Sequence, residues 1–304
     1  MSAAALDALV AALGDVPSWR ERPLAEHTTY RVGGPADLAV FPRRAEELAR
    51  VVRAVRQADL PLTVLGLGSN VLIADRGIRG VVVLLRDLSH IAVDGPRIRV
   101  GAGTDCTTVA ARALAAGLTG LEFFHFLPGS VGGAAFMNAR AFDQEMSQVW
   151  RHARLVTPRG DLVERDYAPE MFRYKHSPLQ DSGALAAELT LRLSPGDPEA
   201  IRACMARNEE KRRANGELEW PSCGCVFKND RRFGAPSGRL IDQCGLKGFT
   251  IGGARVSPRH ANFVVNAGGA TAADLRAVIE HVQAEVERRF GHRLDPEVRF
   301  LGQW

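Results

Sequence analysis

The chain has 304 residues, of which 46% are hydrophobic and 24% charged, and this balance excludes disordered and fibrous proteins. The net charge is +4, but the 39 basic residues are spread along the chain with acids between them, so no basic stripe predicts a nucleic-acid partner. No run reaches the roughly 18 apolar residues of a membrane-spanning helix, so we expect no membrane partner.

The first helix is predicted over residues 3–13, where four apolar residues recur at helical spacing before the stop signal Gly14. An apolar strand follows and ends at Phe41. A second helix is expected over residues 45–58, because its apolar residues share one face, and it stops before Pro61. The N-terminal third therefore mixes helices and strands.

Short strands separated by glycine turns dominate the next part of the chain. They are predicted at Leu62–Leu65, Val71–Ala74, Val81–Leu85 and Ile98–Val100. A helix near residues 105–116 ends at Gly117, and the apolar, glycine-rich stretch 113–139 is expected to be packed loop and strand.

A clear boundary lies at Ser194–Pro198, where turn-forming residues follow the predicted strand Leu189–Leu193. Residues 199–214 are expected to form a charged helix. Thr271 with Asp274 resembles a capping box and predicts a last helix that Gly291 closes. The pattern predicts an α+β chain.

The five cysteines are odd in number and scattered. The N-terminal residues show no basic segment ahead of an apolar one, so we expect a cytoplasmic protein without a disulfide framework. Cys223 and Cys225 are two residues apart, but no second cysteine pair or histidine cluster completes a zinc site. No metal is expected.

Two glycine-rich loops are candidates for binding phosphate, because small residues let backbone N–H groups approach an anion closely. The first comprises Gly66, Leu67, Gly68, Ser69 and Asn70, and the second Gly129, Ser130, Gly132 and Gly133, with Asn138 close behind. The first loop lacks the lysine of a P-loop and opens no helix, and alone it is more often a simple turn. Two such loops together favour a dinucleotide pyrophosphate.

Both loops also belong to an ordered set of segments that resembles the UDP-N-acetylenolpyruvoylglucosamine reductase (MurB) family. The other segments are Thr28–Ala36, Gly120–Phe123, Tyr174–Ser177, Pro221–Asn229, Gly238–Ile241, Gly245–Gly248 and Pro296–Arg299. Their order and spacing agree with the family from about residue 25 to the end of the chain. The length resembles the shorter of the family's two structural types.

The resemblance implies a cytoplasmic oxidoreductase of peptidoglycan synthesis. Two lobes, expected at residues 1–60 and 61–195, would hold noncovalent FAD as in the vanillyl-alcohol-oxidase-like (PCMH-type) flavoproteins, and an α+β lobe at 196–304 would bind the substrate. NADPH would reduce FAD, and the reduced enzyme would convert UDP-N-acetylglucosamine enolpyruvate to UDP-N-acetylmuramate. The expected partner is this small sugar nucleotide, and we expect a monomer.

Three residues match the family's catalytic positions. Lys175 stands at an arginine position, where it keeps the charge but loses the two-pronged grip on a carboxylate. Cys225 stands at the position of the serine that donates a proton, and a thiol is a more acidic donor than a hydroxyl. Glu297 matches the catalytic glutamate, with Arg299 expected on the same strand face and directed at the flavin.

Each of these residues also has a structural interpretation. Lys175 could be a solvated surface lysine, Cys225 a small buried apolar residue and Glu297 an ion-paired carboxylate on an edge strand. Tyr174, Ser222 and Asn229 match positions that contact substrate in the family, and the residues of the two glycine loops, with Asn138, are expected to bind the cofactor.

The chain departs from the family pattern at several positions. Arg140 and Asp143 replace glycines near the flavin, and Asn215–Glu217 replaces a Lys-Gln-Pro segment and removes a cation expected near the substrate phosphates. Two alternatives therefore stay open: a paralogous FAD oxidoreductase acting on another anionic substrate, and a catalytically inactive flavin-binding relative.

Overall fold

The computed structural model describes residues 3–304, which pack as two compact units. The first unit contains residues up to 21, 37–67 and 80–209, and the second contains residues 22–36, 68–79 and 210–304. The division into lobes at 1–60, 61–195 and 196–304 stays a prediction. The packing itself assigns residues 22–36 and 68–79 to the C-terminal unit.

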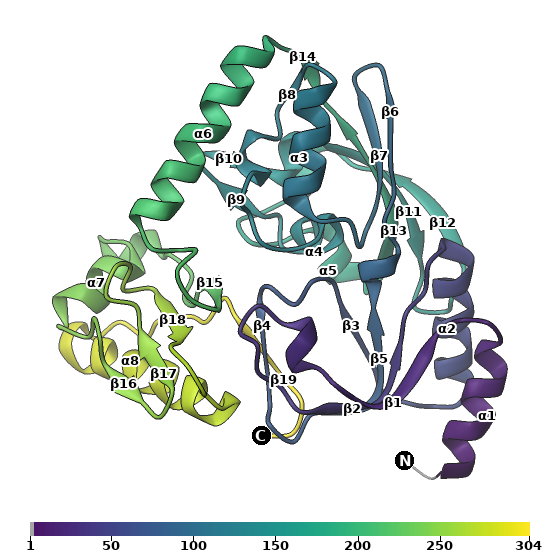
Figure 1. Ribbon diagram of the computed structural model, residues 1–304, viewed down its shortest axis with the longest axis horizontal. Helices are drawn as coiled ribbons and strands as arrows, with labels where there is room; N and C mark the ends of the chain where they lie inside the picture. Colours follow the sequence, from purple (N-terminus) through teal and green to yellow (C-terminus); the bar gives the residue numbers. More distant parts are fainter. Residues whose placement is uncertain (1–2) are drawn as a thin grey trace. The chain divides into compact units, whose positions relative to one another are not determined.

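A four-stranded sheet lies at the N-terminal end of the chain (Figure 1). Its strand order is β1 (Ser18–Pro23), β2 (Pro35–Val40), β5 (Ile78–Leu84) and β3 (Leu62–Leu65), and β3 runs parallel to β5. Helix α1 (Ala3–Leu13) packs against α2 (Ala45–Gln57), whose apolar face is buried. Both helices were predicted from their periodicity and are confirmed.

The second sheet of this unit is antiparallel and five-stranded. Its order is β12 (Leu162–Asp166), β11 (Trp150–Val156), β13 (Leu185–Arg192), β7 (Arg97–Gly101) and β6 (Ile91–Asp94). The helices of this region are α3 (Cys106–Ala115), α4 (Val131–Phe136) and α5 (Pro178–Ser182), and α4 packs on β7 and β13. The expectation of loop and strand alone over 113–139 was wrong, because Ser130 caps α4 despite the glycines that weaken a helix.

The second unit is built on a four-stranded antiparallel sheet with the order β15 (Ser222–Cys225), β18 (Phe263–Asn266), β17 (Ala254–Val256) and β16 (Thr250–Ile251). Helix α8 (Ala272–Phe290) packs on this sheet and against α7 (Ser237–Gln243). Strand β4 (Val71–Ile73) pairs in parallel with β19 (Arg299–Leu301). The predicted capping box of α8 is present, with Thr271 and Asp274 bonded to each other's backbone N–H.

The remaining elements are short or connecting. They are α6 (Pro198–Ala214), the strand pairs β8 (Leu118–Thr119) with β14 (Ser194–Pro195) and β9 (Arg140–Ala141) with β10 (Gln144–Glu145), and the 3-10 helices η1 (Ala25–His27), η2 (Leu85–Asp87), η3 (Glu122–Phe124), η4 (Met146–Gln148), η5 (Pro169–Met171) and η6 (Arg231–Phe233). The mixture of helices and sheets confirms the predicted α+β class.

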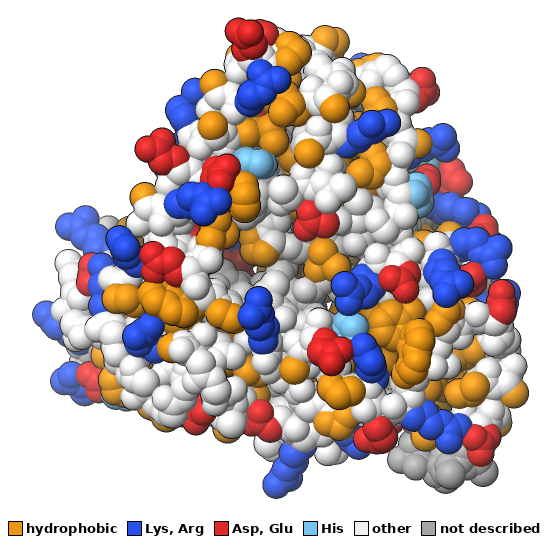
Figure 2. All heavy atoms as spheres, in the orientation of Figure 1, with side chains coloured by type: hydrophobic (Ala, Val, Ile, Leu, Met, Phe, Trp, Pro, Cys, Tyr) orange, Lys and Arg blue, Asp and Glu red, His pale blue; other side chains and the backbone are white. Residues whose placement is uncertain are grey.

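Basic and acidic side chains lie interspersed on the face drawn in Figure 2, and that face carries no continuous run of basic residues. None of the helices in residues 3–304 is both long and apolar enough to cross a membrane.

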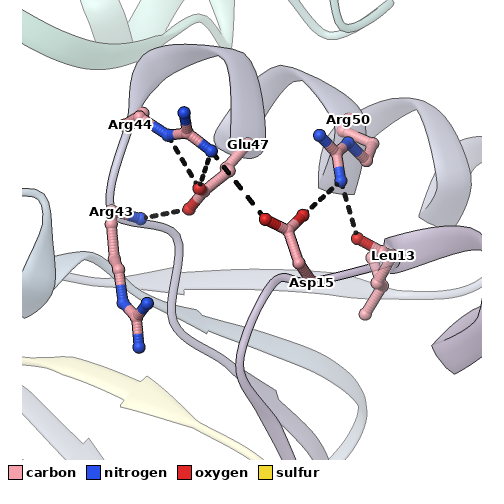
Figure 3. Close-up of polar contacts among 6 residues, drawn as sticks. All are labelled: Leu13, Asp15, Arg43, Arg44, Glu47 and Arg50. Atoms are coloured by element: carbon pink, nitrogen blue, oxygen red, sulfur yellow. Dashed lines mark hydrogen bonds and ion pairs between the residues drawn. The ribbon is translucent and has the colours of Figure 1, made fainter.

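The start of α2 is held by a buried carboxylate (Figure 3). Glu47, the third residue of the helix, is buried; it accepts the backbone N–H of Arg43 at 2.7 Å and two bonds from the Arg44 guanidinium at 2.7 and 2.9 Å. Beside it, exposed Asp15 accepts Arg50 Nη1 at 2.8 Å, and this bond lowers the pKa of Asp15. The same Arg50 atom donates to the last carbonyl of α1, that of Leu13, at 3.1 Å.

Replacing the buried carboxylate should cost far more stability than replacing the exposed one. Glu47→Ala leaves the Arg43 N–H without its partner and should lower the free energy of unfolding by about 2 kcal/mol. Asp15→Ala should change it little, because exposed ion pairs are screened by water. Urea denaturation followed by circular dichroism measures both variants. Equal losses would contradict a special role for Glu47.

Candidate functional site

The start of the first glycine loop, Gly66, lies against the second glycine loop within the first unit. A Cβ atom added to Gly66 would lie 2.2 Å from Ser130 Oγ, so only glycine allows this approach. Ser130 is buried and caps α4 by accepting the N–H of Gly133 at 3.2 Å. The structure therefore brings Gly66 and Ser130 together, although they lie 64 positions apart in the sequence.

The loops differ in the backbone groups that they leave available. At the start of α4, Val131 N–H donates to the Thr104 carbonyl at 2.9 Å and Gly132 N–H to the Ala102 carbonyl at 2.8 Å. Within residues 3–304, by contrast, the N–H groups of residues 67–69 donate no hydrogen bond. The first loop therefore keeps unused backbone donors of the kind that bind anions, whereas the donors at the start of α4 are already used.

Asn138 is buried, and its side chain is used by the protein. Its Oδ1 accepts the N–H of Ser147 at 3.0 Å, and its Nδ2 donates to the carbonyl of Arg173 at 3.2 Å. These bonds tie the end of α4 to the turn that follows residue 173. Direct contact of Asn138 with a cofactor stays a prediction, while its positioning of this turn is visible.

Tyr174 and Lys175 form the tip of that turn. Arg173 and His176 exchange backbone hydrogen bonds of 3.1 and 3.0 Å across it, and Lys175 has a φ of 57°, which is rare for a side-chain-bearing residue. The carbonyl of Lys175 accepts Gln180 Nε2 at 3.1 Å. Tyr174 is 46% exposed, and Lys175 Nζ lies 5.9 Å from the centre of its ring. Strained backbone of this kind clusters at functional sites.

The departures at Arg140 and Asp143 lie in one tight hairpin. Strand β9 is joined to β10 by Phe142 and Asp143, both with positive φ values of 50° and 61°, and Arg140 pairs with Asp143 at 3.5 Å. Both residues at the tip of such a turn need left-handed backbone, which glycine adopts most easily. The Asp143 carboxylate therefore partly compensates the positive charge of Arg140.

In the second unit, a β-bulge decides which way the two neighbouring cysteines face. Ser222 pairs with Val265 and Cys225 with Phe263, so β15 uses one residue more than β18 over the same length. The extra residue fits because Gly224 has a φ of 79°. Directly opposed residues share a face of a sheet, so the bulge places Ser222 and Cys225 on one face, which we name the open face. The name means only the face away from the α8 core, since Ser222, Val265 and Phe263 on it are buried and Cys225 is half-buried.

Cys223 lies on the other side, in the core with Tyr30 and the residues of α8. Burial raises the pKa of the Cys223 thiol to about 12, and the neighbouring Glu297 carboxylate acts in the same direction. A thiol in this state is neither a nucleophile nor a ready proton donor near neutral pH. Cys225, in contrast, is half-buried on the open face.

The segment that carries Glu297 is fixed beside Cys225. The N–H of Glu297 donates to the Val226 carbonyl at 2.7 Å, and the carbonyl of Glu297 accepts Asn70 Nδ2 at 3.1 Å. Asn70 in turn accepts the N–H of Arg299 at 3.1 Å. Val298 is buried in the core, so its neighbours Glu297 and Arg299 are directed away from the core.

The sequence did not indicate which residue fixes the backbone that follows Cys225. Buried Asn262 accepts Phe227 N–H at 3.0 Å through Oδ1, donates to the Phe227 carbonyl at 2.8 Å through Nδ2, and accepts Val226 N–H at 2.8 Å through its backbone carbonyl. No local pattern around Asn262 marks this role, because its partner lies 35 positions away. These three bonds fix the backbone of residues 226 and 227, directly after Cys225.

The predicted substrate contacts in the second unit have different surroundings. Ser222 lies on the open face with Cys225. Asn229 Oδ1 accepts the N–H of Ser237 at 2.9 Å and so helps to start α7. The structure brings Cys225, Glu297, Asn70 and Ser222 together in this unit, whereas Lys175 and Tyr174 belong to the first unit.

Comparison with known proteins identifies both parts of the chain. Residues 36–166 match the family described as FAD binding domain, and residues 216–301 match the family described as UDP-N-acetylenolpyruvoylglucosamine reductase, C-terminal domain. A reductase of that name from Pediococcus pentosaceus is 43% identical over 292 residues, covering 96% of this chain and 97% of the relative. A second, from Symbiobacterium thermophilum, is 42% identical, covering 93% of this chain and 92% of the relative.

A solved structure gives the same result. The crystal structure of UDP-N-acetylenolpyruvylglucosamine reductase (MurB) from Thermus caldophilus has a TM-score of 0.79 and 34% identity to this chain, covering 94% of this chain and 98% of that one. The predicted fold, an FAD-binding unit followed by an α+β C-terminal domain, is confirmed.

The opposite environments of the two cysteines predict selective alkylation. With iodoacetamide at pH 8, the half-buried Cys225 should be labelled in the folded protein, while Cys223 should stay unlabelled because it is 5% exposed and its pKa is about 12. Peptide mass spectrometry distinguishes the two positions. In urea both should react equally, which serves as the control. Equal labelling of the folded protein would show that the bulge does not separate them.

Proposed function

The chain belongs to the UDP-N-acetylenolpyruvoylglucosamine reductase family, and we propose that it reduces UDP-N-acetylglucosamine enolpyruvate to UDP-N-acetylmuramate, a step of peptidoglycan precursor synthesis, with NADPH as the reductant. The observation that carries the proposal is the open face of β15. It presents Ser222 and Cys225 together and beside the fixed segment of Glu297.

FAD, when bound, supplies the hydride that reaches the methylene carbon of the enolpyruvyl group. The FAD-binding domain covers residues 36–166, and the contact of Gly66 with Ser130, together with the N–H donors of residues 67–69, fits a dinucleotide pyrophosphate. Residues 66–70 with 129, 130, 132 and 133 would hold the cofactor, Asn138 would hold its surroundings, and Arg299 would reach the flavin.

The remaining chemistry falls to side chains of this chain. Hydride addition leaves negative charge on the neighbouring carbon and its carboxylate, which preorganised donors and cations must stabilise. We assign Lys175 to the substrate carboxylate and Glu297 to polarising the enolpyruvyl group. Cys225 gives its thiol proton to the carbon that the hydride does not attack. Tyr174, Ser222 and Asn229 would orient the substrate.

Several expectations from the sequence belong to the same proposal. FAD is held without a covalent bond, the protein acts in the cytoplasm, and it works as a monomer on a small-molecule sugar nucleotide with no nucleic-acid partner. The family assignment supports the sugar-nucleotide substrate, because the relatives are named as reductases of a UDP-linked sugar.

Anaerobic half-reactions test the activity and two of the assigned residues. The wild-type protein should be reduced by NADPH and reoxidised rapidly by UDP-N-acetylglucosamine enolpyruvate, followed by flavin absorbance. Glu297→Gln and Lys175→Met should each slow reoxidation by about 10²-fold or more, because they remove charge stabilisation of the transition state. Flavin reduction by NADPH should change little.

Controls for these variants come from exposed, ion-paired residues. Glu280 pairs with Arg276 and Lys247 with Asp242, so Glu280→Gln and Lys247→Met should leave both half-reactions unchanged. Equal losses in both half-reactions would show that Glu297 and Lys175 hold the cofactor or the fold. A wild-type flavin that reduces but ignores this substrate would instead favour a paralogue with another anionic acceptor.

The two cysteines provide a matched test of proton delivery. Cys225→Ala should slow flavin reoxidation strongly, and Cys225→Ser should retain measurable turnover because a hydroxyl can still donate. Cys223→Ala should leave the reoxidation rate within about twofold, because its thiol lies in the core, on the other face of the sheet from Cys225. Stopped-flow absorbance measures all three variants. Wild-type rates in Cys225→Ala would remove Cys225 as the proton donor.

A further inference from the structure

The open face of the C-terminal sheet carries a row of residues that reaches beyond Ser222. Ser222 pairs with Val265 across β15 and β18, and Val265 pairs with Arg255 across β18 and β17. Because directly opposed residues share a face, Arg255 lies on the same face as Ser222 and Cys225. The neighbours of Arg255 in its own strand, Ala254 and Val256, point the other way and belong to the core.

The Arg255 side chain is held in place without any acidic partner. Its guanidinium carbon lies 4.9 Å from the centre of the Trp220 ring, within the range of a cation–π contact. Within residues 3–304, no carboxylate lies within ion-pair distance of Arg255, none of its side-chain nitrogens donates a hydrogen bond, and its Nε is buried. Trp220 is itself fixed, because the next residue, Pro221, accepts the N–H of Asn266 at 2.9 Å.

These properties distinguish Arg255 from the paired arginines of the same unit. Arg288, for example, lies on α8 and binds Glu285 at 2.7 Å, so its charge is already compensated. The buried Nε of Arg255 lacks a hydrogen-bond partner, which costs free energy, and its guanidinium keeps donors that an anion can accept from. The planar guanidinium of arginine can donate two parallel N–H bonds to two phosphate oxygens. Stacking on an aromatic ring fixes its orientation before the ligand binds.

We propose that Arg255, stacked on Trp220, binds a phosphate of the sugar-nucleotide diphosphate and determines the enzyme's preference for a nucleotide-linked substrate. The inference rests on the proposed function for the identity of the ligand. Two inter-strand spacings separate Ser222 from Arg255, which is about 10 Å between their Cα atoms. A span of this size accommodates the sugar ring that separates the enolpyruvyl group from the diphosphate.

Arg255 also offers a cation where the sequence has lost one. Asn215–Glu217 lacks the lysine expected near the phosphates, and Glu217 is already bonded to Arg212 at 2.7 Å and to Asn215 Nδ2 at 3.1 Å. This segment therefore carries the acid Glu217 in place of a cation, and Glu217 is already bonded to residues of the protein. Arg255, on the open face, has no such internal partner among the residues that the structure describes.

Calorimetric titration of the FAD-containing protein with UDP and with uridine tests the proposal. Arg255→Met should raise the Kd of UDP at least tenfold and leave the Kd of uridine unchanged, because only UDP carries the phosphates. Arg255→Lys, which keeps the charge but loses the planar guanidinium, should give an intermediate Kd for UDP. Arg288→Met is the matched control, since it removes a paired arginine behind the same sheet, and it should bind both probes like the wild type.

The outcomes separate a phosphate contact from a structural role. An unchanged Kd for UDP in Arg255→Met, with normal flavin content and normal circular dichroism, would overturn the proposal. A parallel loss of UDP and uridine binding would also overturn it, because a phosphate contact cannot weaken uridine. If Arg255→Met does not fold, Arg255→Lys decides by the same comparison of UDP with uridine.

Failure of this inference and failure of the proposed function give different results. Chemically reduced enzyme is mixed anaerobically with UDP-N-acetylglucosamine enolpyruvate, and the half-saturating concentration for reoxidation is measured. In Arg255→Met it should rise about tenfold while the maximal rate stays unchanged, since the phosphate lies away from the reacting carbon. A wild-type flavin that is not reoxidised, in a protein that still binds UDP through Arg255, would overturn the proposed function alone.

Discussion

The geometry of the C-terminal site depends on one extra residue in one strand. Without the bulge at Gly224, regular alternation would place Ser222 on one face of β15 and Cys225 on the other. With it, both lie on the open face while Cys223 enters the core. Two cysteines of the same chemistry thereby acquire opposite properties, since burial raises the pKa of one thiol to about 12 and leaves the other half-buried.

Hydrogen bonds from the surrounding chain fix the backbone next to the bulge. The second unit joins three separate segments of the sequence, and their contacts converge near Cys225. Asn262 fixes residues 226 and 227 from one side, and Asn70 fixes Glu297 and Arg299 from the other. Farther away, the Asp75 carboxylate accepts two N–H groups at the start of α8, at 2.8 and 3.0 Å, and ties residues 68–79 to that helix.

In the first unit, tertiary contacts likewise fix the backbone around Gly66 and Ser130. Gly66 and Ser130 can touch because one has no side chain and the other has a small one, and the hydroxyl of Ser130 is used to cap α4. The end of α4 then fixes the turn of Tyr174 and Lys175 through Asn138 and Gln180. One short helix thus connects Gly66 and Ser130 to the turn of Lys175 within the unit. Helix α4 was not predicted from the sequence, because it is short and contains two glycines.

The sequence alone determined the features that depend on neighbours along the chain. Periodic apolar residues predicted α1, α2 and α8, the pair Thr271 and Asp274 predicted a helix cap, and ordered motifs predicted the family, because such signals act over a few residues. Only the tertiary structure decided which cysteine lies in the core, that Asn138 is occupied by backbone partners, and that Arg255 lies in line with Ser222. These facts depend on strand register and on a bulge, which bring together residues that lie tens of positions apart, and no local pattern specifies that pairing.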